Sequence, residues 1–131
     1  EDQGWLAHFM KMALKGRGVT VFGDGRQVRD ALFVEDLVDA VEAAYARRRK
    51  CAGRIYNVGG GPGSTISLRE LVAWIERRSG RPLPVSWGPW RPGDQKVYVS
   101  DIRRARRELG WRPKTGLEAG LERLWSWLES S

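Results

Sequence analysis

Strand-like runs are few in this chain and only four to seven residues long, and amphipathic segments separate them. The apolar pattern predicts extended segments at 19–22, 27–33, 54–58, 83–87 and 96–99. It predicts helices at 3–15, 35–48, 67–78, 101–109 and 117–128. Strands this short build only a small sheet, so the pattern indicates a small mixed α/β domain rather than a complete doubly wound fold.

Two of the predicted helices carry additional sequence signals. Ser67-Leu-Arg-Glu70 has the pattern of a capping box, and Gly80 is placed to end the helix that this box begins. In the helix at 35–48, apolar side chains recur at helical spacing, and we expect this stripe to be buried. It consists of Leu37, Val38, Val41, Ala44 and Tyr45.

The composition is that of one globular domain, because 131 residues allow a modest core and 41% of them are hydrophobic. No apolar run approaches the roughly 20 residues of a membrane span. The polar start at Glu1–Gly4 does not predict a signal peptide. The single cysteine, Cys51, cannot form an internal disulfide, so we expect a cytoplasmic protein.

The formal net charge of +7 favours anionic partners. Basic runs at 47–50 and 103–107 suggest nucleic acid, but Ile102, Ala105 and Leu109 take the inner face of the second run. The arginines are then solvated, and no nucleic-acid-binding motif accompanies them. A basic nucleic-acid or protein-interaction module remains an alternative, although we do not expect nucleic acid as the partner.

The loop Gly59-Gly-Gly-Pro-Gly63 follows a predicted strand and precedes a helix, as a phosphate-binding loop would. It lacks the GxxxxGK[ST] lysine and the GxGxxG spacing, and Pro62 removes a backbone donor, so we predict a tight structural turn. His8 is the only histidine, and no cluster has metal-ligand spacing. We therefore predict no catalytic, cofactor-binding or metal-binding residue in this chain.

Two segments, 19–30 and 88–101, place arginines in extended chain or loops between structured elements. Arginine suits a diphosphate because its planar guanidinium donates several hydrogen bonds and stays charged. Phe22 and Trp90 are aromatic residues in the same segments that could lie against a base or a sugar.

These segments, together with others in a fixed order, resemble the C-terminal region of nucleotide-sugar epimerases and dehydratases, which are extended short-chain dehydrogenases/reductases. The resemblance covers nearly the whole chain. The matching pieces are Phe22-Gly23, Val28-Arg-Asp30, Val34-Glu-Asp-Leu37, Tyr56-Asn-Val-Gly59, Ser67-Leu-Arg-Glu-Leu71, Arg91-Pro-Gly-Asp94 and Leu109-Gly-Trp-Arg-Pro113. It implies that residues 1–131 are the nucleotide-sugar-binding domain of such an enzyme, without its Rossmann half.

The resemblance implies a role for particular positions. Arg29 and Arg91 match arginines that grip the substrate's diphosphate, and Thr20 and Phe22 match strand positions beside the nucleotide base. Within the family, the pieces Asp2-Gln-Gly-Trp5, Gly25-Arg-Gln-Val-Arg-Asp30 and Asp94-Gln-Lys-Val-Tyr98 look closest to the CDP-sugar 2-epimerases.

Two further positions follow from the same resemblance. Asp94 matches a position near the nucleotide ribose, and Tyr98 matches one that shapes the sugar pocket in related 4-epimerases.

The sequence departs from the family in two respects. It has no GxxGxxG loop to receive NAD, and none of its three tyrosines has a lysine four residues later, as the catalytic YxxxK pair requires. The resemblance therefore implies a parent enzyme that uses NAD and is a homodimer, whereas this chain alone is expected to be inactive and to bind no NAD. The parent reaction remains open between a CDP-sugar 2-epimerase and a 4-epimerase, 4,6-dehydratase or decarboxylase acting on another nucleotide sugar.

Overall fold

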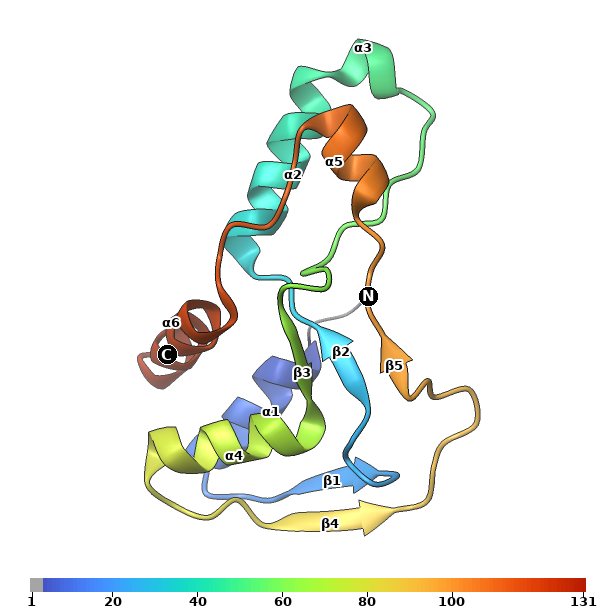
Figure 1. The fold of residues 1–131 in the computed structure, drawn as a ribbon. Coiled ribbons are helices and arrows are strands. Elements are labelled where there is room, and N and C mark those ends of the chain that lie inside the picture. Colours follow the sequence, from blue (N-terminus) through green and yellow to red (C-terminus); the bar gives the residue numbers. More distant parts are fainter. Residues whose placement is uncertain (1–3) are drawn as a thin grey trace. The chain divides into compact units, whose positions relative to one another are not determined.

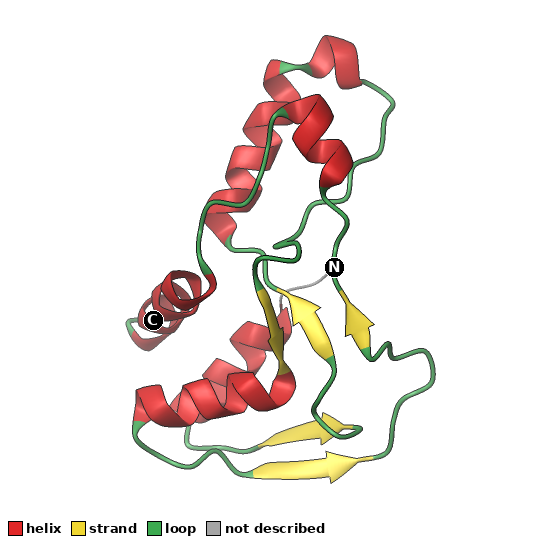
Figure 2. Ribbon diagram, viewed as in Figure 1, coloured by secondary structure: helices red, strands yellow, loops and turns green. Residues whose placement is uncertain are grey.

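The computed structural model describes residues 4–131. Its helices are α1 (Gly4–Leu14), α2 (Val34–Ala46), α3 (Arg48–Cys51), α4 (Leu68–Ser79), α5 (Arg103–Leu109) and α6 (Leu117–Glu129). Its strands are β1 (Val19–Phe22), β2 (Val28–Asp30), β3 (Thr65–Ser67), β4 (Val85–Gly88) and β5 (Val97–Tyr98). Helices with a few short strands confirm the predicted small mixed α/β fold (Figures 1 and 2).

The strands form two small sheets. β1 pairs with β4 in parallel, and β2 lies between β3 and β5, with β5 parallel to it. Parallel strands need a crossover, and the chain between β1 and β4 includes α2 and α4. The three-residue β3 was not predicted, because so short a run has no readable alternation.

The chain divides into two compact units. The first unit contains residues 1–29, 66–98 and 121–131, and the second contains residues 30–65 and 99–120. The candidate substrate-binding positions all fall in the first unit.

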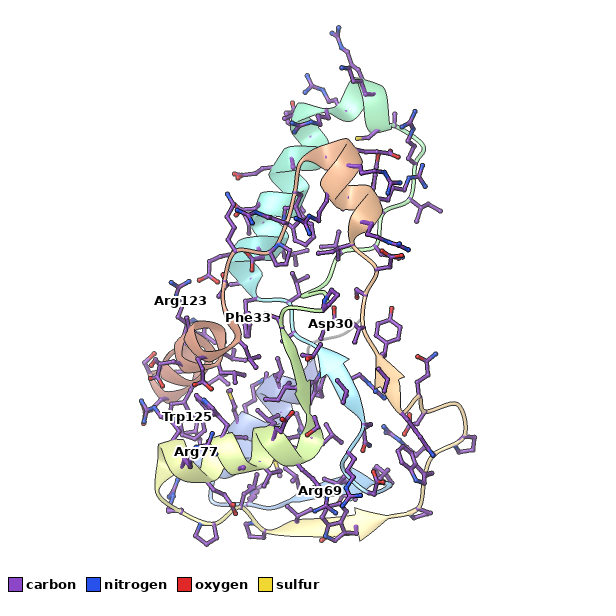
Figure 3. The ribbon with its side chains drawn as sticks, viewed as in Figure 1. Asp30, Phe33, Arg69, Arg77, Arg123 and Trp125 are labelled. Atoms are coloured by element: carbon purple, nitrogen blue, oxygen red, sulfur yellow. The ribbon has the colours of Figure 1, made fainter. Side chains whose placement is uncertain are left out.

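The core of the first unit is built from α1, α4, the last turns of α6 and β1. Trp74 and Trp125 meet edge to face, with ring centroids 6.2 Å apart, and the guanidinium of Arg78 lies over the Trp125 ring. Figure 3 labels Trp125, which lies on α6. The buried side chains of α1 are Leu6, Phe9, Met10 and Ala13.

Most helix signals in this unit are confirmed. Ser67 and Glu70 form the capping box, and Gly80 ends α4 in the left-handed conformation. In α1, Trp5 and Met12 recur at helical spacing but are only half-buried. The predicted start of this helix at Gln3, and residues Asp2 and Gln3 of the subfamily match, lie outside the described residues.

The core of the second unit joins α2 to α5 and to the chain after α5. Its buried residues are Ala40, Ile102, Ala105, Leu109 and Trp111. The arginines of α5 point outward, as predicted, and α5 begins at Arg103 rather than at Asp101. Asp101 does accept a hydrogen bond from the Arg103 backbone N–H at 3.1 Å.

The prediction for the face of α2 was wrong. Four of the five stripe residues, Leu37, Val38, Val41 and Tyr45, are exposed, and the inner face is formed by Asp36 and Ala40. Asp36 is 2% exposed, and its carboxylate accepts the backbone N–H groups of Lys114 and Thr115 at 2.9 and 3.0 Å. These bonds turn the apolar stripe outward.

The predicted strand at 54–58 is also not formed. This segment lies between α3 and the glycine loop, and neither sheet includes it. A strand needs a neighbouring strand to share its backbone hydrogen bonds, and neither sheet provides one for residues 54–58. The helix predicted at 35–48 ends at Ala46, and α3 follows as a separate turn.

The carboxylate of Glu108, on α5, is hydrogen-bonded to the start of segment 54–58. It accepts hydrogen bonds from the Tyr56 hydroxyl at 2.8 Å and from Arg54 at 3.0 Å, and Arg104 bonds its other oxygen. The Tyr56 hydroxyl, followed by the Arg54 guanidinium, lowers the pKa of Glu108 to about 2. The carboxylate therefore stays charged, and keeps these contacts, down to strongly acidic pH.

Candidate functional site

The β1–β4 pair presents two different faces. The register pairs Thr20 with Ser86 and Phe22 with Gly88. Because side chains alternate along a strand, Thr20, Phe22 and Ser86 project on one side, whereas Val21 and Trp87 project on the other. Thr20 and Ser86 are both exposed, so the side that carries Phe22 is open.

The structure brings three of the predicted positions into contact at the end of this strand pair. The guanidinium of Arg91 lies 4.8 Å from the centroid of the Phe22 ring, within range of a cation–π contact. Its Nε donates to Asp94 Oδ2 at 3.0 Å. Arg91 is largely exposed, so this cluster is a cationic edge beside an aromatic face, open to solvent.

Trp90 extends the same aromatic surface. Its ring packs directly on Gly23, where an added Cβ would come within 2.7 Å of the indole. Gly23 also has φ +99°, a region that favours glycine. Glycine at position 23 therefore lets the Trp90 indole lie directly on the backbone next to Phe22 in the sequence, and the indole remains 38% exposed.

Arg29 and Tyr98 form a second pair in the same unit. They are register partners on β2 and β5, so their side chains project on the same face. Both side chains are half-buried, and Arg29 Nη1 donates to the carbonyl of Val28. A cation next to a phenol is a suitable arrangement for phosphate and sugar oxygens.

Gln27 lies in the chain between the Phe22–Arg91 cluster and the Arg29–Tyr98 pair, and the sequence analysis did not single it out as a site residue. Its side chain is 4% exposed, and its Nε2 donates to the carbonyl oxygen of Phe22 at 2.8 Å. Its backbone carbonyl accepts the N–H of Leu68 at the start of α4. Gln27 therefore fixes the turn between Phe22 and Arg29, and no signal in the sequence shows this role, because it depends on a bond to the Phe22 backbone.

The glycine loop at 59–63 has a structural role, as predicted. Asp30 Oδ2 accepts the backbone N–H of Gly61 at 2.9 Å, and a Cβ at Gly60 would overlap the carbonyl of Ala31 (Figure 3 labels Asp30). The loop thus packs closely against Asp30 and Ala31 through its backbone.

Another pair of family-like pieces is also structural. Trp111 donates its indole N–H to the Asp36 carbonyl at 2.9 Å, which joins Val34-Glu-Asp-Leu37 to Leu109-Gly-Trp-Arg-Pro113.

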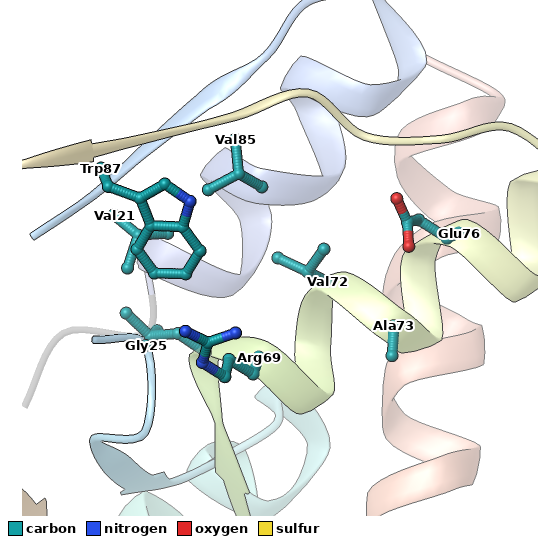
Figure 4. Close-up of a pocket in the computed structure, with 9 residues that line it drawn as sticks. Val21, Gly25, Arg69, Val72, Ala73, Glu76, Val85 and Trp87 are labelled. Atoms are coloured by element: carbon teal, nitrogen blue, oxygen red, sulfur yellow. The ribbon is translucent and has the colours of Figure 1, made fainter. Parts of the chain in front are cut away.

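A small cavity of about 140 Å³ lies on the opposite side of the β1–β4 pair, against α4 (Figure 4). Arg69 lies over the Trp87 ring at 4.6 Å and donates to the Asp24 carbonyl. Val21 of β1 and Val72 of α4 both line the cavity. Arg69 and Glu76 also line it, so its walls are mixed in polarity, and it lies on the face of the β1–β4 pair opposite Phe22.

Other chemistry is limited in the part of the chain that the structure describes. Residues 4–131 contain no group of three or more His, Cys, Asp or Glu side chains placed to hold a metal ion. His8 is on the exposed side of α1, and Cys51 donates to the Ala44 carbonyl. Within residues 4–131, no helix has the length and apolarity needed to cross a membrane.

Comparison with known proteins identifies the family. A profile described as GDP-mannose 4,6 dehydratase matches residues 6–124. CDP-paratose 2-epimerase of Salmonella typhi is 31% identical, over 98% of this chain and 40% of its own length.

Solved structures of nucleotide-sugar epimerases have the same fold as this chain. The UDP-glucose 4-epimerase of Thermotoga maritima with UDP-glucose superposes with a TM-score of 0.83 at 31% identity, over 97% of this chain and 40% of that one. The UDP-glucuronic acid 4-epimerase of Bacillus cereus, in complex with UDP-glucuronic acid and NAD, gives 0.84 at 26% identity, over 95% and 39%. The chain thus spans about two fifths of the length of these relatives. It belongs to the nucleotide-sugar epimerase and dehydratase family of the extended short-chain dehydrogenases/reductases.

Proposed function

We propose that this chain is the substrate-binding part of an NAD-dependent nucleotide-sugar epimerase, and that its substrate is a CDP-sugar epimerised at C2. The observation that carries the proposal is the contact of Phe22, Arg91 and Asp94 at the open end of β1 and β4. An aromatic ring receives a base, and an adjacent arginine receives a diphosphate.

The choice of a CDP-sugar rests on the similarity to CDP-paratose 2-epimerase. The similarity to a UDP-glucose 4-epimerase of equal identity supports a second candidate, a 4-epimerase acting on a UDP-sugar. Thr20 and Ser86 are the exposed hydroxyls beside Phe22, where the edge of a base would be read.

The chemistry in this proposal belongs to an NAD-binding half that carries the catalytic tyrosine and lysine. Bound NAD would supply hydride removal and return at a sugar carbon. Residues 4–131 would contribute binding and orientation: Arg29 and Arg91 hold the diphosphate, and Tyr98 lies beside the sugar. We propose that the enzyme is cytoplasmic, because Cys51, the one cysteine of these 131 residues, forms no disulfide, and that it is a homodimer.

The test is isothermal titration of the 131-residue chain with CDP, CMP and UDP. CDP should bind about tenfold more tightly than CMP, because the second phosphate adds charge-assisted bonds to arginine. CDP should also bind more tightly than UDP. Equal affinity for CDP and CMP would contradict the arginine grip, and preference for UDP would favour the second candidate.

A further inference from the structure

The turn between β1 and β2 is hydrogen-bonded to the start of α4. The first N–H groups of a helix have no partner within the helix, so they are available to other parts of the chain. Here the backbone N–H of Leu68 donates to the Gln27 carbonyl at 3.3 Å, and that of Arg69 donates to the Gly25 carbonyl at 2.9 Å. The backbone of the turn is therefore attached to α4 at two points.

The side chain of Arg69 adds a third attachment to the same turn. Its Nε donates to the Asp24 carbonyl, and its guanidinium lies over the Trp87 ring, 4.6 Å from the centroid (Figure 4). Gly25 packs against both side chains, because a Cβ added there would lie 2.9 Å from Arg69 Cγ and 3.2 Å from the indole. Arg69 and Trp87 thus contact the turn together.

This turn joins the two groups of candidate substrate-binding side chains. Phe22 precedes it at the end of β1, and Trp90 packs on Gly23 within it. At its other end, Gln27 donates to the Phe22 carbonyl, and Arg29 follows on β2. A displacement of the turn would therefore move the aromatic ring of Phe22 relative to the guanidinium of Arg29.

Arg69 lies on the side of the strand pair that faces away from Phe22. Trp87 projects on that side, because side chains alternate along a strand, and the Arg69 guanidinium lies against its ring. Arg69 is also exposed, so it adds little to the core of the first unit. An effect of this residue on a ligand beside Phe22 is then indirect and passes through the turn.

We infer that Arg69 is a positioning residue for the nucleotide-sugar substrate, because it holds the turn at residues 23–25 in the conformation that presents Phe22 to the base and Arg29 to the diphosphate. This inference rests on the proposed function. Arginine suits the role, since its planar guanidinium can stack on an indole and donate a hydrogen bond at the same time. A turn held in place before the substrate arrives lowers the entropic cost of binding.

The test is isothermal titration of the 131-residue chain and its variants with CDP. Methionine is flexible and can still lie on the indole, but it donates no hydrogen bond. We expect Arg69→Met to weaken CDP binding about fivefold, which is within the contribution of one hydrogen bond. Lysine keeps a cation and a donor, so Arg69→Lys should recover the affinity to within about twofold of the parent.

Arg77→Met is the matched control for charge. Arg77 is exposed on the same helix, so its replacement removes the same charge without a bond to the turn, and CDP binding should equal that of the parent chain. Equal losses in Arg69→Met and Arg77→Met would mean that only net charge matters, and would overturn the inference.

A ligand-free measurement separates positioning from loss of stability. All three variants should melt within about 2 °C of the parent, because substitutions of exposed side chains change stability little. In the ¹⁵N spectrum, Arg69→Met should shift the backbone amide of Arg29, which belongs to β2 and not to the turn, whereas Arg77→Met should not. An affinity loss that follows the melting temperature across the variants, without this shift, would show a purely structural role and contradict the inference.

The titrations also distinguish this inference from the proposed function. If the parent chain binds CDP and Arg69→Met binds it equally well, the positioning role is wrong while the proposed function stands. If the parent chain binds no CDP, the proposed function fails and the inference fails with it.

Discussion

Replacing Arg29 and Arg91 together by alanine is expected to reduce CDP affinity at least tenfold, or to below detection. A charge-assisted hydrogen bond contributes about 1.5–3 kcal/mol when it is shielded from water. The site is open, so we expect less from each arginine, but the combined loss should still exceed about 1.4 kcal/mol, which is tenfold. Titration calorimetry measures this change.

Removing Arg91 has an additional consequence at the site. Asp94 now pairs with Arg91, and without the guanidinium its carboxylate would face the diphosphate as a like charge. We therefore expect Arg91→Ala to be the more damaging single change. Arg107→Ala, an exposed arginine of α5, is the control for net charge and should bind CDP like the parent chain. Loss of binding in that control would indicate nonspecific attraction.

Asp36→Ala is expected to produce the largest loss of stability. The change removes two partly buried hydrogen bonds and leaves the backbone N–H groups of Lys114 and Thr115 without their acceptor. Leaving a buried donor unsatisfied costs about 1–3 kcal/mol, so the loss should be roughly 2–4 kcal/mol in total. The midpoint of thermal unfolding should fall by roughly 10 °C.

The matched variant for this prediction is Glu42→Ala on the same helix. Glu42 is exposed, so its removal should change the midpoint by little. Asp36→Asn should fall between the two, because the amide keeps one acceptor and presents a donor where the second is needed. A midpoint for Asp36→Ala that equals that of Glu42→Ala would mean that the carboxylate does not brace the second unit.

The sequence predicted helices well where local signals are strong. The capping box at Ser67 and the left-handed Gly80 fix the ends of α4 through bonds within a few residues, which can be read directly from the sequence. Periodicity also located α2, but it does not tell which side of a helix is covered. There, Asp36 and Ala40 form the inner face, because distant backbone N–H groups hold the Asp36 carboxylate and the small Ala40 fits against α5.

The sequence nominated the residues of the candidate site, but it could not give their geometry. Phe22, Arg91 and Asp94 were assigned from their resemblance to family motifs, and the structure shows them in contact. The pairing of Thr20 with Ser86 and of Arg29 with Tyr98 depends on strand register between distant segments. Gln27 was missed because its role is a bond to the backbone of Phe22.

Binding of CDP at the Phe22–Arg91 cluster is tested most directly by a titration of the ¹⁵N-labelled chain with CDP, followed amide by amide. We expect chemical-shift changes to cluster at residues 20–23, 27–29, 88–94 and 98, with the indole N–H of Trp90 among them. We expect no change at the glycine loop at 59–63 or in the basic helix α5. Shifts confined to that loop or to α5, or no shift at about 10 mM CDP, well above a millimolar dissociation constant, would contradict binding at this cluster.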